Sequence, residues 1–148
     1  MPIPSSSASP QAIPPDLPKF SREVSVMAWI EDAYGNFLMV RQAQGKKLWT
    51  LPGGKVKATE TLEAGLFREI EEEIGGQVRT AYPTAIFDRP EKRNLTVLYR
   101  VSLIRQRFRI GNTREIATIE FKARRPTRSS PSAIYFCRLR ERFGLGWR

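Results

Sequence analysis

Acidic side chains are concentrated in one short segment of a strongly basic chain. Six glutamates fall between Glu60 and Glu73, in a chain of 148 residues with a net charge of +10. On a helix, Glu69, Glu72 and Glu73 would share one face, with Cβ atoms ~5–6 Å apart. Like charges at that distance repel by roughly 3 kcal/mol at an effective dielectric of 20. Solvent, a basic side chain or a bound cation would relieve this repulsion, and oxygen ligands of this kind suit Mg²⁺ or Mn²⁺.

The residues around these acids predict the helix that positions them. Residues 61–74 place five apolar side chains on one arc at helical spacing: Leu62, Leu66, Phe67, Ile70 and Ile74. Gly75 and Gly76 predict the end of the helix. Upstream, the strand "LWTL" stops at Pro52, and the glycines that follow allow close backbone approach. Taken alone, "EIEEEI" also fits a plain solvent-exposed face.

Composition narrows the chemistry that is open to the chain. It contains no histidine, which excludes Ser-His-Asp and Cys-His catalysis as well as zinc sites built on imidazole. A single cysteine, Cys137, cannot form an internal disulfide. The N-terminus lacks the pattern of a secretory signal, and no apolar run approaches the roughly 20 residues of a membrane span. We therefore expect a cytoplasmic protein with no membrane partner.

Pattern changes along the chain predict one folded domain behind a tail. Residues 1–19 carry six prolines and a serine-rich patch, which predict a flexible tail, and residues 20–148 form the domain. "EVSVMAWI" and "FLMV", separated by "DAYGN", predict a hairpin. Further strands are predicted at "QVRTAYPTAIF", "LTVLYRVSLI" and "EIATIEF", and Ser130-Pro131 predicts the start of a closing helix that ends near Phe143. This mixed order indicates an α/β or α+β layered domain.

The acidic segment also matches a longer register, G-x5-E-x7-R-E-U-x-E-E-x-G-U, where U is a bulky aliphatic residue. The matching positions are Gly54, Glu60, Arg68, Glu69, Ile70, Glu72, Glu73 and Gly75. With the preceding "WTLPGG", this pattern resembles the Nudix hydrolases over roughly residues 22–145. The last position departs from it, because Gly76 replaces the usual aliphatic residue, and we expect a local loss of packing at the helix exit.

The resemblance implies an α/β/α sandwich with a mixed β-sheet and a loop-helix-loop segment that binds a divalent metal, Mg²⁺ or Mn²⁺. It implies hydrolysis of a phosphoanhydride bond in a nucleoside diphosphate linked to another group. By this resemblance, Glu69, Glu72 and Glu73 are the metal-binding and catalytic acids, and the Gly53 carbonyl is a further metal ligand. Arg68 would orient the glutamates, and Glu60 would support the loop.

Further candidates lie inside and outside this segment. Some family members take a base from a later loop or strand, for which we select Glu115 first and Glu120 second, although either also fits an ordinary surface acid. Arg41, Lys55 and Gly54 are predicted to meet the substrate phosphates. Trp49 fits a core position better than a stacking platform for a base, and Gly65 fits either helix packing or space for metal or substrate.

By the same resemblance, substrate choice depends on residues outside the acidic segment. The short domain resembles enzymes that act on (d)NTPs or oxidised nucleotides, and this is the substrate we expect. ADP-ribose or nucleotide-sugar hydrolysis, RNA 5′-end hydrolysis and a non-hydrolytic nucleotide sensor stay open as alternatives. So does a nucleic-acid binder, because residues 100–148 carry thirteen Lys or Arg against three Glu. RNA is compatible but not favoured, and a homodimer stays open because such domains often dimerise.

Overall fold

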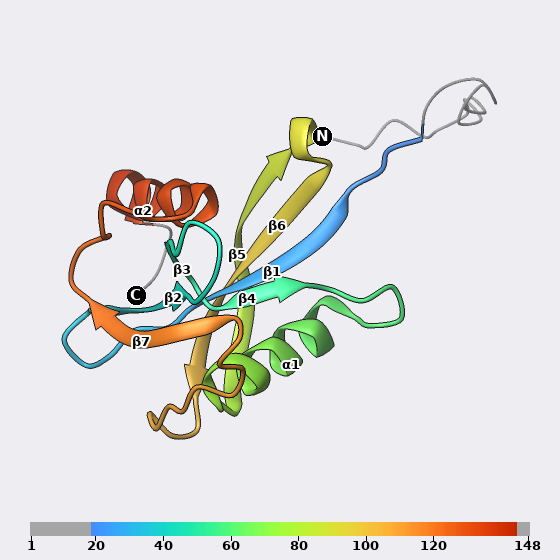
Figure 1. Cartoon of the computed structure of the whole chain (residues 1–148). Coiled ribbons are helices and arrows are strands. Elements are labelled where there is room, and N and C mark those ends of the chain that lie inside the picture. Colours follow the sequence, from blue (N-terminus) through green and yellow to red (C-terminus); the bar gives the residue numbers. More distant parts are fainter. Residues whose placement is uncertain (1–18, 145–148) are drawn as a thin grey trace, which may run out of the picture.

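The computed structural model describes residues 19–144, and the predicted tail over residues 1–19 therefore lies almost entirely outside the described residues. Seven strands, two α-helices and one 3₁₀ helix follow one another in a mixed order (Figure 1). They are β1 Glu23–Trp29, β2 Phe37–Gln42, β3 Trp49–Thr50, β4 Gly53–Lys55, α1 Leu62–Ile74, β5 Val78–Arg89, η1 Pro90–Lys92, β6 Asn94–Leu103, β7 Ile116–Lys122 and α2 Pro131–Phe143.

The strands form two sheets that share the middle layer of the molecule. One sheet has the order β4-β1-β6-β5, and the other has the order β3-β2-β7. Strands β1 and β6 run parallel, whereas β4 and β5 are antiparallel to their neighbours, so the first sheet is mixed. The mixed sheet matches the sequence prediction.

The two helices cover opposite faces of this middle layer (Figure 1). Leu66, Ile70 and Ile74 of α1 pack in one buried cluster with side chains of β1, β2 and β6. Ala133, Phe136 and Cys137 of α2 pack in a second cluster, with Trp29 and Leu98 among its buried members. Burial of these apolar faces stabilises the layers, and the arrangement confirms the predicted α/β/α sandwich.

Both helix predictions are confirmed at their ends. The Thr61 hydroxyl accepts a hydrogen bond from the Ala64 amide at the start of α1, and Gly75 ends it in the left-handed conformation with φ 66°. Ser130 caps α2 in the same way, Pro131 follows, and the helix ends at Phe143. Phe67 departs from the predicted apolar arc, since 45% of it is exposed.

The predicted hairpin of β1 and β2 is wrong in its pairing. The chain does turn there, with a bridge between Glu31 and Phe37, but the two strands then join different sheets. β1 pairs instead with β6 and with β4, a strand that the sequence did not reveal because two of its three residues are glycine. This pairing brings the Gly53-Gly54 backbone beside the middle of β1.

The expected packing loss at Gly76 is also wrong. A Cβ atom at this position would lie 2.9 Å from Ile70 Cγ2 and 3.3 Å from Leu103 Cδ1. The space that an aliphatic side chain would fill is already occupied, so glycine is the residue that fits.

No helix within residues 19–144 is long and apolar enough to cross a membrane.

Candidate active site

A tight junction between β4 and β1 brings the diglycine to the acidic helix. Gly53 has φ 153°, and a Cβ atom there would lie 2.0 Å from the carbonyl oxygen of Val26. A Cβ atom on Gly54 would lie 2.6 Å from the carboxyl carbon of Glu69. Only glycine allows the loop backbone to sit this close to both β1 and the carboxylate.

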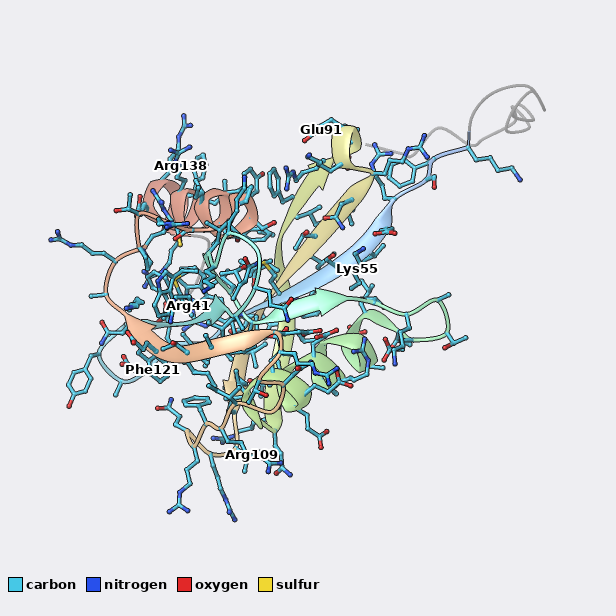
Figure 2. All side chains as sticks on the ribbon, viewed as in Figure 1. Arg41, Lys55, Glu91, Arg109, Phe121 and Arg138 are labelled. Carbon is cyan, nitrogen blue, oxygen red and sulfur yellow. The ribbon has the colours of Figure 1, made fainter. Side chains whose placement is uncertain are left out.

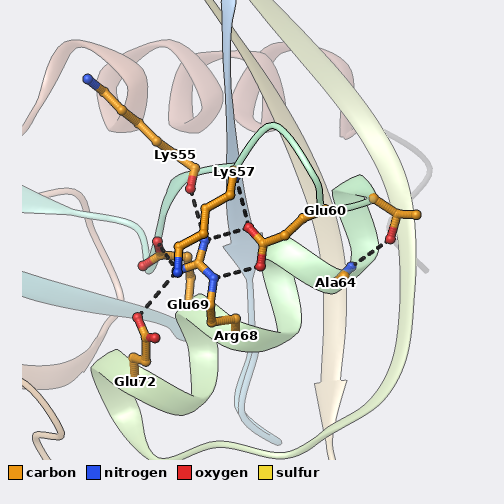
Figure 3. Close-up of polar contacts among 8 residues, drawn as sticks. Lys55, Lys57, Glu60, Ala64, Arg68, Glu69 and Glu72 are labelled. Atoms are coloured by element: carbon orange, nitrogen blue, oxygen red, sulfur yellow. Dashed lines mark hydrogen bonds and ion pairs between the residues drawn. The ribbon is translucent and has the colours of Figure 1, made fainter.

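Arg68 is the centre of the acidic cluster (Figure 3). Its guanidinium donates to both Glu60 oxygens at 2.7 and 2.8 Å, to Glu69 at 2.8 Å and to Glu72 at 3.3 Å. A further bond to the Lys55 carbonyl ties it to the loop. Hydrogen bonding to Arg68 lowers the pKa of Glu60 to about 2, and the pKa of Arg68 is raised chiefly by its bond to Glu60. One cation therefore fixes the positions of Glu69 and Glu72.

Glu73 lies deeper than the other acids. It is 5% exposed, and one of its carboxylate oxygens accepts a hydrogen bond from the Gly53 amide at 3.1 Å. Burial raises its pKa to about 9 despite this bond, and the negative charges of Glu69 and Glu115 add to the shift. Glu69 and Glu115 therefore lie close enough to Glu73 for their charges to oppose its ionisation.

A hollow of about 640 Å³ opens beside Glu73. Its lining includes Gly53 and Glu73, Arg114 and Glu115 of the loop before β7, and Gln42 and Gln44 at and after the end of β2. The loop that carries Glu115 is held there by hydrogen bonds from the Ala43 amide to the Glu115 carbonyl and from the Gln44 amide group to the Arg114 carbonyl. The structure therefore brings Glu115, the first candidate for a base, to the acidic helix.

The two predicted phosphate-binding cations do not reach this hollow. Arg41 points to the opposite face of β2, where it contacts the Thr118 hydroxyl at 3.5 Å. The Lys55 side chain is 73% exposed, pairs with Glu23 at 2.9 Å and extends away from Glu69 and Glu72 (Figure 3). Successive side chains of a strand point to opposite faces, which explains the orientation of Arg41: its neighbours Val40 and Gln42 line the hollow instead.

The remaining candidates, Glu120, Trp49 and Gly65, each contact other parts of the fold. Glu120 pairs with Lys122 at 2.6 Å, and the Lys122 ammonium lies 4.2 Å from the Trp49 ring centroid. Trp49 itself packs at the edge of the core beneath α2. A Cβ atom on Gly65 would meet the Val56 side chain at 3.0 Å, so Gly65 serves close helix-strand packing.

The chemistry of the donor set fits a hard divalent cation. As the side chains lie, no three acidic, cysteine or histidine side chains within residues 19–144 enclose a metal position, and Glu69 and Glu72 are paired with Arg68. Glu73, however, is a buried acid to which none of the described cations bonds, beside a second acid. A divalent ion would favour its ionised form, and carboxylate and backbone oxygens are the ligands that Mg²⁺ and Mn²⁺ prefer.

The comparisons with known proteins agree with this geometry. The family model of the NUDIX domain matches residues 21–128, which contain the diglycine loop, α1 and Glu115. The chain belongs to the Nudix family. Among solved structures, a MutT NUDIX hydrolase from Burkholderia pseudomallei superimposes with a TM-score of 0.72 at 21% identity, covering 79% of this chain and 96% of that one. A NUDIX hydrolase from Nitrosomonas europaea gives 0.71 at 22% identity, over 85% and 74% of the two chains.

Two curated relatives match a shorter part of this Nudix protein. The RNA pyrophosphohydrolase of Teredinibacter turnerae is 37% identical over 46 residues, which is 31% of this chain and 27% of the relative. The RNA pyrophosphohydrolase of Saccharophagus degradans is 39% identical over the same share of each chain. The match thus spans about a quarter of the length of either relative.

The sequence did not single out the loop that follows β6. Arg109 and Asn112 from this loop line a second hollow together with Glu72. A signal was present in "RQRFRIGNTR", where arginines alternate with Phe108 and Ile110 before a glycine and an asparagine. Alternating cations and apolar anchors indicate a loop that is fixed on one side and charged on the other.

Proposed function

We propose that this Nudix protein is a divalent-metal-dependent pyrophosphohydrolase acting on a nucleotide phosphoanhydride. The observation that carries the proposal is that one helix presents Glu69 and Glu72, held by Arg68, and Glu73, held by the Gly53 amide, while Glu73 and Glu115 line the same hollow. With a divalent cation bound, a carboxylate cluster of this kind suits a reaction in which charge develops on phosphate oxygens.

Hydrolysis needs water delivered to phosphorus. The water oxygen forms a bond to a phosphorus atom, the bridging P–O bond breaks, and the leaving phosphate keeps the electron pair. The water proton passes to a carboxylate, and our candidate for this base is Glu115, which lines the hollow beside Glu73. Arg68 holds Glu69 and Glu72 in place during this step, and the Gly53 amide holds Glu73.

A bound Mg²⁺ or Mn²⁺ would lower the pKa of the attacking water and neutralise the phosphates. Glu69, Glu72 and Glu73 would hold it, with the Gly53 carbonyl as a further ligand. Retention of all three acids favours hydrolysis over a nucleotide sensor, which can bind a nucleotide without them. The substrate is a nucleoside 5′-polyphosphate or a larger molecule that carries one. The (d)NTP expected from the sequence is one such molecule.

The test is a matched pair of variants. E72Q should lower kcat by about a thousandfold or more on the preferred substrate. The substitution removes the proposed metal ligand and its negative charge but keeps the shape of the side chain. E91Q removes the same charge at η1, at the far end of β5 and β6 (Figure 2), and should leave kcat unchanged. Phosphate and pyrophosphate release should be measured with dNTPs, 8-oxo-dGTP, ADP-ribose, nucleotide sugars and 5′-triphosphate RNA, with and without chelator.

Full turnover by E72Q, or turnover that chelator does not affect, would contradict the mechanism. Inertness of the wild type toward every substrate, together with tight nucleotide binding, would support the sensor alternative instead.

A further inference from the structure

Residues 104–115, here called the arginine loop, connect β6 to β7 and carry Arg105, Arg107, Arg109 and Arg114. All four are exposed. Within residues 19–144 none of these guanidinium groups has an ion pair or hydrogen bond of its own, unlike Arg68, which bonds three glutamates. Four unpaired cations in ten residues make a positive surface that attracts anions.

The loop is fixed to the acidic helix rather than projecting freely. Phe108 packs edge-to-face on Phe121 at 5.7 Å between ring centroids, and Ile110 packs on the core beneath α1. The amide of Gly111 donates to the Glu73 carbonyl, and a Cβ atom on Gly111 would lie 2.0 Å from the Glu72 carbonyl oxygen. The loop backbone therefore lies directly against the turn that carries Glu72 and Glu73.

Two neighbouring hollows lead outward from the acids along this loop. The first, about 580 Å³, is lined by Arg68, Glu71 and Glu72 of α1 and by Arg109, Gly111 and Asn112 of the loop. The second, about 300 Å³, is lined by Arg105 and Arg107, again with Arg109. Arg109 lines both hollows, which are therefore neighbours, and Figure 2 shows it at the edge of the molecule beside α1.

We propose that the arginine loop binds the phosphodiester backbone of a single-stranded RNA whose 5′-polyphosphate lies at Glu69, Glu72 and Glu73. This inference rests on the proposed function and names its substrate class. A mononucleotide has no phosphate beyond the reacting group, so it could not meet Arg105 and Arg107, which line the hollow next to the one that Glu72 lines. A polynucleotide repeats a negative charge at every residue and can occupy the whole path.

The loop supplies the physical requirements for such a strand. Guanidinium groups match phosphate geometry with paired donors, and their exposure lets a flexible strand reach them. Phosphate contacts carry no sequence information, so the loop would position RNA chains regardless of their bases. The names of the two curated relatives support RNA as the polynucleotide.

The test compares two substrates that share one reacting group, GTP and a short single-stranded RNA beginning with 5′-triphosphoguanosine. R105Q/R107Q should lower the ratio of kcat/KM for the RNA to kcat/KM for GTP by about tenfold at low salt. It should also make the salt dependence of the RNA reaction shallower by about 1.4 in log-log slope, since each single-strand phosphate contact contributes about 0.7. Arg109 is left intact because its stem covers Gly75 at the end of α1.

The control is R124Q/R138Q, which removes the same charge from exposed positions, Arg138 lying on α2 at the other side of the molecule (Figure 2). An equal fall in both double variants would overturn the loop's role and assign the effect to net charge. Equal wild-type efficiency on GTP and RNA, unchanged by R105Q/R107Q, would overturn the inference and leave the proposed function intact. Competition by polyglutamate that is as strong as competition by an RNA with a 5′-hydroxyl end would also overturn the inference, in favour of a general polyanion surface.

If neither GTP nor this RNA is hydrolysed, the wider substrate panel decides the proposed function, and anisotropy of a 3′-labelled triphosphate RNA decides the inference separately. Weaker binding by R105Q/R107Q than by R124Q/R138Q would retain the loop as an RNA-binding surface, and equal binding would overturn it.

Discussion

Individual acids in α1 differ in role because their surroundings differ. Glu60 is held by Arg68 and by the Lys57 amide, so its charge stabilises the loop before the helix. Glu69 and Glu72 share one nitrogen of the same arginine, whereas Glu73 is buried against Gly53. The two glycines determine how close the backbone comes to these acids.

Substitution of each glycine by alanine should therefore have a different effect. G53A should lower the free energy of unfolding by about 2–4 kcal/mol, because its Cβ would collide with the β1 backbone in a strained conformation. G54A should fold but lower kcat by about a hundredfold, because the Glu69 carboxyl group must move. Urea unfolding and steady-state kinetics measure both. Full activity in G54A would show that the position of Glu69 is not critical.

At the scale of elements, the ion pair of Glu60 with Arg68 joins the loop after β4 to the middle of α1. Hydrogen bonding to Arg68 holds the pKa of Glu60 at about 2, below an ordinary value of 4.5. A carboxyl group with a lowered folded-state pKa stabilises the fold fully above the ordinary value and loses that contribution as pH falls toward the folded value. The loop-helix junction should accordingly be sensitive to acid.

The difference in unfolding free energy between wild type and E60Q should be largest above pH 5 and should shrink as pH falls from about 4.5 toward 2. Urea titrations across this range measure it. E91Q, on an exposed carboxyl group at η1, is the matched control and should show little difference at any pH. A constant difference for E60Q would mean that its ion pair does not couple folding to protonation.

Elements and their partners differ in how well the sequence predicts them. Both helices were predicted to within a residue at their ends, because Thr61, Gly75 and the Ser130-Pro131 pair act locally. Strand pairing is non-local: the turn after β1 was predicted, but the parallel partner β6 lies about seventy residues later.

The same distinction applies to the site. The register of α1 placed Glu69, Glu72 and Glu73 together, since helical spacing alone decides which side chains share a face. Arg41 was assigned to the phosphates without knowledge of which face of β2 it occupies, and Arg109 was not singled out because its proximity to Glu72 depends on how a loop folds back onto α1.

At the scale of the whole molecule, positive charge surrounds a small acidic centre. The chain carries 25 Lys and Arg against 15 Asp and Glu, yet Glu73 lies buried among other acids. Positive surface attracts phosphate, whereas the acids repel it until a cation is bound. Metal binding and the stability of the whole domain should therefore be linked.

Mg²⁺ or Mn²⁺ that binds only the folded state should raise Tm. At a hundredfold excess over Kd the gain is about 2.7 kcal/mol, or roughly 5–10 °C for a domain of this size. Differential scanning fluorimetry with each ion, without substrate, measures this independently of catalysis and ranks the two ions. E72Q should show a much smaller rise at the same ion concentration because it loses one ligand, whereas E91Q should match the wild type. A wild-type Tm that neither ion changes would contradict a metal site formed by these three glutamates.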